Sequence, residues 1–136
     1  MNKEEIKKII PHREPMLLVD EIYLNDDGTT TGIYTVKGDE FFLKGHFPNN
    51  PIVPGVILCE MAAQSSCVIL AEKVKGKNTY LTSMNNVKFK KMVTVGDKVV
   101  FTCTLTRVLG AVHFMKAIGC VNDEIVMSGD FTFVLN

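Results

Sequence analysis

The chain has 136 residues, a length that fits one domain, and we expect residues 1–136 to form a single folded unit. Apolar residues make up 46% of the chain, which is enough for one hydrophobic core. Lysine and arginine together number 15, as do aspartate and glutamate, so the net charge is zero. This balance disfavours nucleic-acid binding through bulk positive charge.

The N-terminal sequence and the cysteines both indicate a cytoplasmic protein. The first eight residues are rich in charge and lack the apolar core of a signal peptide. The cysteines form no CxxC pair and lie in apolar runs, which is typical of buried thiols in a reducing compartment rather than of disulfides or a zinc site. These cysteines are Cys59, Cys67, Cys103 and Cys120.

The chain opens with signals for a short helix and two strands. Asn2 followed by Glu5 predicts a capping box, and Pro11 ends the helix. Residues 16–24 and 29–37 then predict strands because they are rich in apolar and β-branched side chains, and an Asn-Asp-Asp-Gly turn joins them.

An ordered loop and one long helix follow. Residues 45–55 contain three prolines and two glycines, which excludes a helix or a central strand. Residues 56–74 contain helix formers and no proline or glycine, so they predict a helix that is apolar on nearly every side. Glu60 and Gln64 interrupt the apolar run, which argues against a membrane span and for a helix wrapped by a sheet.

The second half of the chain alternates between strands and turns. Strands are predicted over residues 79–90, 98–109, 112–121 and 124–135, with Gly110 and Asn122-Asp123 as turns. One long helix among five or six largely antiparallel strands predicts an α+β fold.

Glu60 is the first candidate for chemistry. It lies in the second turn of a helix without an obvious solvent face, and a buried carboxylate needs a partner or a proton. Gln64 lies four residues on, on the same face, where it can hold Glu60 or a water beside it. The alternative is an exposed glutamate that is favoured by the dipole at the helix N-terminus.

His46 is the second candidate. It lies in the proline-rich loop, where the backbone fixes the direction of its side chain. A single histidine in a loop is, however, more often an exposed residue without a catalytic role. The loop that carries His46 leads directly into the helix that carries Glu60. A histidine base and a carboxylic acid of raised pKa together would supply acid–base chemistry. The amides of Gly55 and Val56, after Pro54, lie at the positive helix end, where a substrate oxygen can approach.

Other sites are less favoured. The three histidines are scattered and do not predict a zinc site, and no other cofactor is indicated. Cys59 points about 100° away from Glu60 on the helix, which favours a core position over a nucleophile. For Asp20 and the pair His12-Arg13 we favour a structural ion pair. The basic cluster Lys88, Lys90 and Lys91 is typical of a solvated strand face, with Phe89 pointing inward.

Three segments of the chain carry a family resemblance. The loop and helix read Gly45-His46-Phe47-Pro48-x-x-Pro51-x-x-Pro54-Gly55-Val56, with Glu60 and Ala63-Gln64 further on. The opening reads Ile10-Pro11-His12-Arg13-x-Pro15-x-Leu17-Leu18-Val19-Asp20, and a later part reads Val87-Lys88-Phe89-Lys90 with Gly96-Asp97. Together they resemble the 3-hydroxyacyl-[acyl-carrier-protein] dehydratases of bacterial type II fatty-acid synthesis. Asn49 and Val95 depart from the family pattern at two loop positions, and neither replaces a proposed catalytic group.

The resemblance implies a hotdog fold, in which a curled antiparallel sheet wraps one central helix. It also implies a homodimer, often in a trimer of dimers, with His46 from one subunit and Glu60 from the other at each site. His46 would remove the proton beside the thioester, Glu60 would protonate the departing hydroxyl, and the Gly55 amide would bind the thioester oxygen. Gln64, Phe47 and Pro54 would support the site.

The implied partner is an acyl carrier protein, and the resemblance implies no metal or organic cofactor. Because a carrier protein is acidic, we expect a local basic rim formed by Lys44, Lys88, Lys90 and Lys91. Lys88 and Lys90 would share one face of their strand, opposite Phe89.

Three other activities remain open at this point. A thioesterase of the same fold would hydrolyse the thioester, and a non-catalytic acyl-binding subunit would have no use for a glutamate facing a histidine. Glu60 favours the simple dehydratase over the related enzyme that also isomerises the double bond, which carries Asp at this position, although some relatives with Glu do both.

Overall fold

The computed structural model describes residues 1–71, 73 and 77–136 of the chain. Its helices are α1 (Lys3–Ile6) and α2 (Gly55–Cys67), and its 3-10 turns are η1 (Phe41–Leu43) and η2 (Val68–Leu70). Its strands are β1 (Glu21–Leu24), β2 (Thr30–Thr35), β3 (Thr79–Phe89), β4 (Lys98–Leu109), β5 (Val112–Val121) and β6 (Glu124–Leu135).

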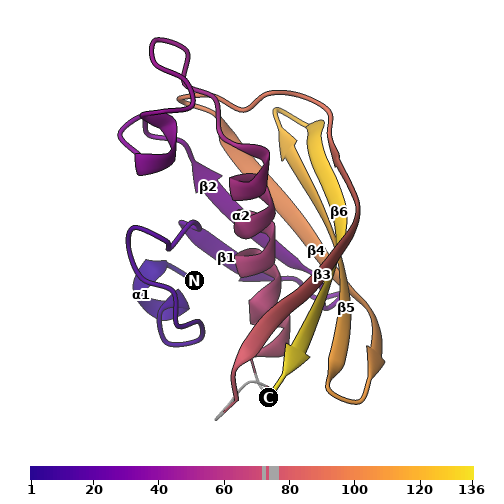
Figure 1. Ribbon diagram of the computed structural model, residues 1–136. Coiled ribbons are helices and arrows are strands. Elements are labelled where there is room, and N and C mark those ends of the chain that lie inside the picture. The colour runs from indigo at the N-terminus through magenta and orange to yellow at the C-terminus, as the bar shows by residue number, and fades with distance from the viewer. Residues whose placement is uncertain (72, 74–76) are drawn as a thin grey trace.

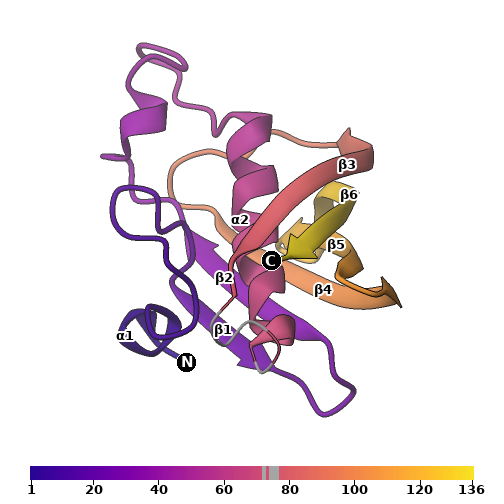
Figure 2. The same ribbon diagram turned by 60° about the horizontal axis from the view of Figure 1, so that its bottom comes forward.

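The strands form one six-stranded antiparallel sheet in the order β1-β2-β4-β5-β6-β3. This sheet curls around α2, which lies against its concave side (Figures 1 and 2). The architecture is the α+β fold that the sequence pattern predicts, in the hotdog arrangement that the family resemblance implies, so the predicted fold class is confirmed. β3 is one edge of the sheet and pairs only with β6, with two shifts of register along this pairing.

The core lies between the concave face of the sheet and α2. Every residue of α2 from Leu58 to Cys67 is buried except Glu60. Phe101, Met115 and Phe131 reach the helix side of the sheet and are almost fully buried. A helix that is apolar all round is stable only when its whole circumference is covered, and here the sheet and the N-terminal segment cover it.

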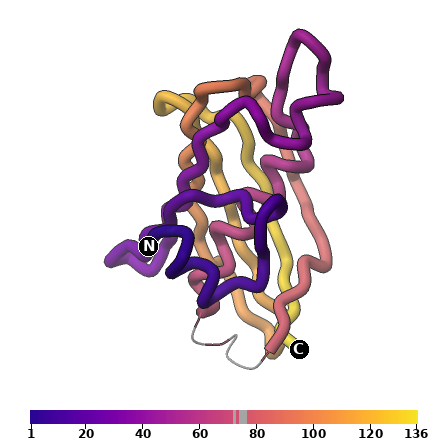
Figure 3. The backbone as a smooth tube through the Cα atoms, turned by 90° about the vertical axis from the view of Figure 1, so that its left-hand side faces the viewer, coloured from indigo at the N-terminus to yellow at the C-terminus, as the bar shows by residue number. Residues whose placement is uncertain are grey.

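The N-terminal segment lies along the side of α2 that the sheet leaves open (Figure 3). The predicted capping box at Asn2 and Glu5 is present. The predicted strand over residues 16–24 is wrong for its first part, because only Glu21–Leu24 pairs with β2. The backbone of Met16 and Leu18 is instead hydrogen-bonded by the side chain of Gln64, which supplies the partners that a neighbouring strand would otherwise provide.

The predicted helix over residues 56–74 is too long, since α2 ends at Cys67 and continues only as the turn η2; Val74 itself lies outside the described residues. The hydroxyls of Ser65 and Ser66 bind the carbonyls one turn back, a pattern that weakens and bends helices. No helix in the described ranges has both the length and the apolar character needed to cross a membrane.

The strand predictions in the second half agree closely with the structure. β4, β5 and β6 have the predicted bounds, and β3 ends one residue earlier. Gly110, Asn122 and Asp123 have positive φ angles of 59°, 50° and 64°, which the turns between these strands require.

Candidate active site

The loop that carries His46 is tied down at several points. Phe47 and Asn50 exchange two backbone hydrogen bonds of 3.0 and 2.9 Å, which close a tight turn. The Ile52 amide returns to the His46 carbonyl at 2.9 Å. The Thr94 hydroxyl donates to the Pro51 carbonyl at 2.7 Å and connects the loop to the segment before β4. The proline-rich sequence therefore forms an ordered loop, as predicted.

The His46 ring is held by one hydrogen bond and one stacking contact. Its Nδ1 lies 2.8 Å from the Ile52 carbonyl oxygen, which can only accept, so Nδ1 carries the hydrogen. The Phe47 ring stacks on the imidazole with 4.1 Å between centroids. In the neutral ring, this tautomer leaves Nε2 with a free lone pair, which is the form a general base needs.

His46 lines a largely apolar cavity of about 700 Å³. This cavity is large enough for part of an acyl chain. Its other lining residues are Ile52, Val53, Gly55, Leu58, Phe89, Lys90, Lys91, Met92 and Val93.

Gly55 begins α2 at this cavity. The first hydrogen bonds of the helix run from Ile57 and Leu58 to the Pro54 carbonyl, so the Gly55 and Val56 amides precede them at the positive end of the dipole. A Cβ on Gly55 would lie 2.8 Å from the tip of the Phe89 ring. The absence of a side chain at position 55 therefore allows this ring to lie directly over the helix start.

Glu60 lies in a different environment. Gln64 donates from Nε2 to Glu60 Oε1 at 2.9 Å, which is the contact that the spacing of four residues predicts. His12 Nε2 lies 3.4 Å from the same oxygen. The side chains of Glu60 and His12 are 27% and 29% exposed, so Glu60 is partly buried rather than a free surface carboxylate.

The predicted raised pKa of Glu60 is wrong for the single chain. Burial acts to raise the pKa of the Glu60 carboxyl, but its contacts with His12 and Gln64 lower the pKa by more. The net pKa lies below the ordinary value of a glutamate. The His12 contact was missed because the pairing joins residues 48 positions apart; the Pro-His-Arg sequence in the opening segment was its only signal.

His46 and Glu60 do not meet within one chain. Within the described residues, the cavity around His46 includes Leu58 but not Glu60. Two helix positions correspond to a rotation of about 200°, so Glu60 leaves α2 on nearly the opposite side from Leu58. A single chain therefore presents a histidine on one side of α2 and a carboxyl on the other.

The predicted docking lysines separate into two groups. Lys90 and Lys91 line the His46 cavity, and Lys91 also pairs with Glu124. Lys88 lies with Lys116 on another face. The prediction that Lys88 and Lys90 share a face is wrong because β3 ends at Phe89 and the strand alternation ends with it.

The structure also tests the predictions for Phe89, Cys59 and Asp20. Phe89 points inward toward the start of α2, as predicted, but it lies at the margin of the core and is 50% exposed. Cys59 is buried in the core, as predicted. Asp20 pairs with Lys3 and Lys37 rather than with His12 or its neighbour.

The other predicted site residues are solvent-accessible. Lys44 and Val56 are exposed, and Phe47 is 48% exposed. In residues 1–71, 73 and 77–136, no three histidine, cysteine or acidic side chains lie close enough to hold a metal ion.

Comparisons with known proteins agree on one family. The FabA-like domain family matches residues 10–130. The 3-hydroxyacyl-[acyl-carrier-protein] dehydratase FabZ of Clostridium botulinum (strain Loch Maree / Type A3) is 40% identical over 134 residues, covering 96% of this chain and 93% of its own. The dehydratase FabZ of Syntrophomonas wolfei is 40% identical over 138 residues, covering 99% and 96%.

A solved structure supports the fold independently. The dehydratase heterocomplex ApeI:P from Xenorhabdus doucetiae aligns with a TM-score of 0.82, at 18% identity, over 96% of this chain and 90% of that one. At this identity the likeness concerns the fold alone, and it agrees with the curled sheet around a central helix.

Proposed function

The chain belongs to the FabA-like family and is a 3-hydroxyacyl-[acyl-carrier-protein] dehydratase, a hydro-lyase of fatty-acid biosynthesis, and we propose that His46 and Glu60 carry out its elimination of water. The observation that carries this assignment of roles is the tautomer of His46. Its hydrogen bond to the Ile52 carbonyl leaves Nε2 as a base at the wall of an apolar cavity.

The proposed reaction removes a proton from carbon 2 of the acyl chain and the hydroxyl group from carbon 3. His46 Nε2 removes a proton from carbon 2, next to the thioester carbonyl, and the carbonyl oxygen gains enolate character. The Gly55 amide, assisted by Val56 at the start of the same helix, donates to this oxygen. Electrons then return from the enolate to form the double bond, the carbon 3–oxygen bond breaks, and the hydroxyl takes the proton of Glu60 to leave as water.

We infer that each site combines His46 of one subunit with Glu60 of a partner subunit. β3 is an eleven-residue edge strand with unpaired backbone groups on its outer side, which is a ready surface for pairing with a second copy. Tyr80, Leu81 and Met84 add exposed apolar side chains along it. Such a dimer would also bury Glu60 further and so raise its pKa toward the value that an acid requires.

We propose that the carrier protein docks beside Lys90 and Lys91, since both line the His46 cavity. Charge of this kind acts mainly on the rate of encounter and is screened over about 8 Å at physiological ionic strength. Lys44, exposed beside the loop, would extend this rim, whereas Lys88 lies on the other face and would contribute little. We also propose a cytoplasmic location, which the four unpaired thiols within the described chain support.

Subunit exchange tests the shared site. His46→Ala and Glu60→Gln proteins should each fold and lose about 10²–10⁴-fold in turnover of a 3-hydroxyacyl carrier-protein substrate. After dissociation and mixing, heterodimers contain one site in which both groups are intact, so part of the activity should return. Native mass spectrometry verifies the heterodimers and distinguishes a dimer from a trimer of dimers.

Two results would contradict the proposal, one for the catalytic residues and one for the shared site. Near-parental activity in either folded variant would remove that residue from the mechanism. Verified heterodimers without regained activity would show that each site is built within one chain.

A further inference from the structure

The contacts of Glu60 leave its two carboxyl oxygens in different situations. Gln64 Nε2 lies 2.9 Å from Oε1, and His12 Nε2 lies 3.4 Å from the same atom. Two nitrogens therefore converge on one oxygen. No contact of this kind involves Oε2 in the part of the chain that the structure describes.

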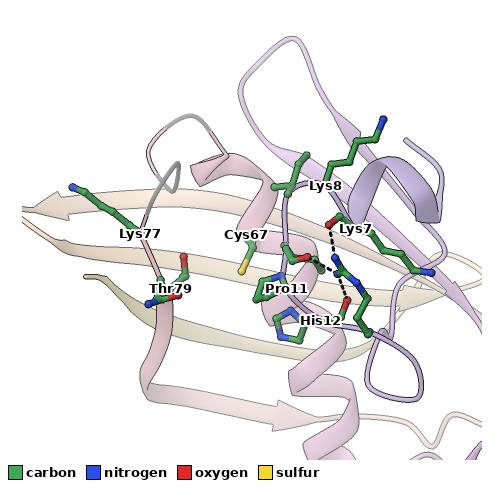
Figure 4. Close-up of a pocket in the computed structure, with 11 residues that line it drawn as sticks. Lys7, Lys8, Pro11, His12, Cys67, Lys77 and Thr79 are labelled. Atoms are coloured by element: carbon green, nitrogen blue, oxygen red, sulfur yellow. Dashed lines mark hydrogen bonds between the residues drawn. The ribbon is translucent and has the colours of Figure 1, made fainter.

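The backbone around His12 is itself anchored. The Arg13 guanidinium donates to the carbonyls of Lys7, Ile10 and His12 at 3.0, 3.0 and 2.7 Å. Arg13 thus holds the segment from Lys7 to His12 as one unit and places the His12 ring beside α2. In Figure 4, His12 and Pro11 lie next to Cys67 of this helix.

The His12 ring has only one partner for its two nitrogens. Nδ1 is buried and has no hydrogen-bond partner among the described residues. A hydrogen on Nδ1 would be buried without an acceptor, which is unfavourable, whereas a hydrogen on Nε2 faces Glu60 Oε1. The ring is therefore oriented to donate to Glu60.

We propose that His12 is a positioning residue for the acid step: with Gln64 it engages Oε1 of Glu60 and so directs the proton-bearing Oε2 toward the substrate hydroxyl. This inference rests on the proposed role of Glu60 as the acid. The proton moves from Oε2 to the departing hydroxyl, which leaves as water, and the carboxylate that remains is stabilised at Oε1 by the two donors. His12 itself gains and loses no proton in this step.

The same contacts make the carboxyl a stronger acid. Of the titratable groups that face Glu60, His12 comes from the N-terminal segment and Cys67 from α2. Burial, followed by the charge of Glu60, raises the pKa of Cys67 to about 12, so this thiol stays neutral over the working pH range. Removing His12 leaves the effect of burial on Glu60 less opposed, and the pKa of Glu60 should rise.

The test compares His12→Leu, which removes the donor, with His12→Gln, whose Nε2 can take the place of the ring Nε2. His12→Leu should lower kcat about 10- to 100-fold with little change in KM, because a misaligned acid slows the chemical step. The alkaline limb of its kcat/KM profile should move to higher pH, since that limb reports the loss of the acid proton. His12→Gln should recover most of kcat. Lys8→Leu, an exposed neighbour that lines the same surface cavity as His12, should match the parent.

The outcomes separate this inference from the proposed function. A recovered kcat in His12→Gln, together with a shifted limb in His12→Leu, supports positioning. An unmoved limb, or an equal loss in both variants, overturns it and leaves a purely structural role. If His12→Leu does not fold, NMR titration of the Glu60 carboxyl in His12→Ala, which also lacks the donor, and in the parent decides the question: a raised pKa supports the inference and an unchanged pKa refutes it. Glu60→Gln assayed in parallel must be inactive; if it is active, the proposed function itself fails.

Discussion

Replacing Gln64 by methionine should destabilise the protein substantially although the two side chains are similar in volume. Gln64 is 1% exposed, and its amide accepts from the Leu18 N–H at 2.8 Å and donates to the Met16 carbonyl at 2.8 Å. The Leu18 amide is buried, so the loss of its acceptor costs about 1–3 kcal/mol. The Met16 carbonyl is only partly buried, and water can replace its donor at a cost of about 1 kcal/mol.

The expected loss in the free energy of unfolding for Gln64→Met is therefore about 2–4 kcal/mol, a large part of the roughly 5–15 kcal/mol typical of a domain. Ser66→Ala provides the control, since Ser66 is 0% exposed but its hydroxyl binds only the Ala62 carbonyl of its own helix. That variant should lose no more than about 1 kcal/mol. Urea unfolding at one fixed protomer concentration measures both values. Equal losses in the two variants would refute the view that Gln64 satisfies the backbone of the N-terminal segment.

Three further predictions concern other positions. Gly32→Ala would place a methyl group 2.0 Å from the Ser65 hydroxyl. Urea unfolding should show a loss of about 3 kcal/mol in the free energy of unfolding, and a loss below about 1 kcal/mol would mean that the helix and the sheet can separate easily. Gly55→Ala should change stability by less than about 1 kcal/mol, because the half-exposed Phe89 ring can move, yet turnover should fall because the added methyl group hinders the approach of the thioester oxygen to the helix start; unchanged turnover would mean that this approach does not require glycine at position 55. For Glu40, burial acts to raise the pKa, but hydrogen bonds from two backbone amides and a tyrosine hydroxyl lower it below 4.5. Its stabilisation is therefore present above that pH and lost as the pH falls through the folded-state pKa, so melting temperatures of Glu40→Gln should fall less steeply on acidification than those of the parent.

The sequence determined the secondary structure best where local chemistry acts alone. The bounds of β4, β5 and β6 were predictable because positive-φ turn residues separate runs of β-branched and apolar side chains. The ordered loop before α2 was predictable because three prolines leave the backbone few conformations. The contact between Glu60 and Gln64 was predictable because a spacing of four residues fixes it on any helix.

The tertiary structure alone decided which distant groups meet. The backbone at Met16 and Leu18 has apolar side chains typical of a strand, but Gln64 occupies its hydrogen-bonding groups from 46 and 48 residues away. The pKa of Glu60 falls rather than rises because His12 reaches it across the same gap in sequence. Residue types and local spacing therefore identified the candidate acid and base, while their protonation and their separation across α2 depend on packing, since electrostatic interactions depend on distances in space that the order of residues does not contain.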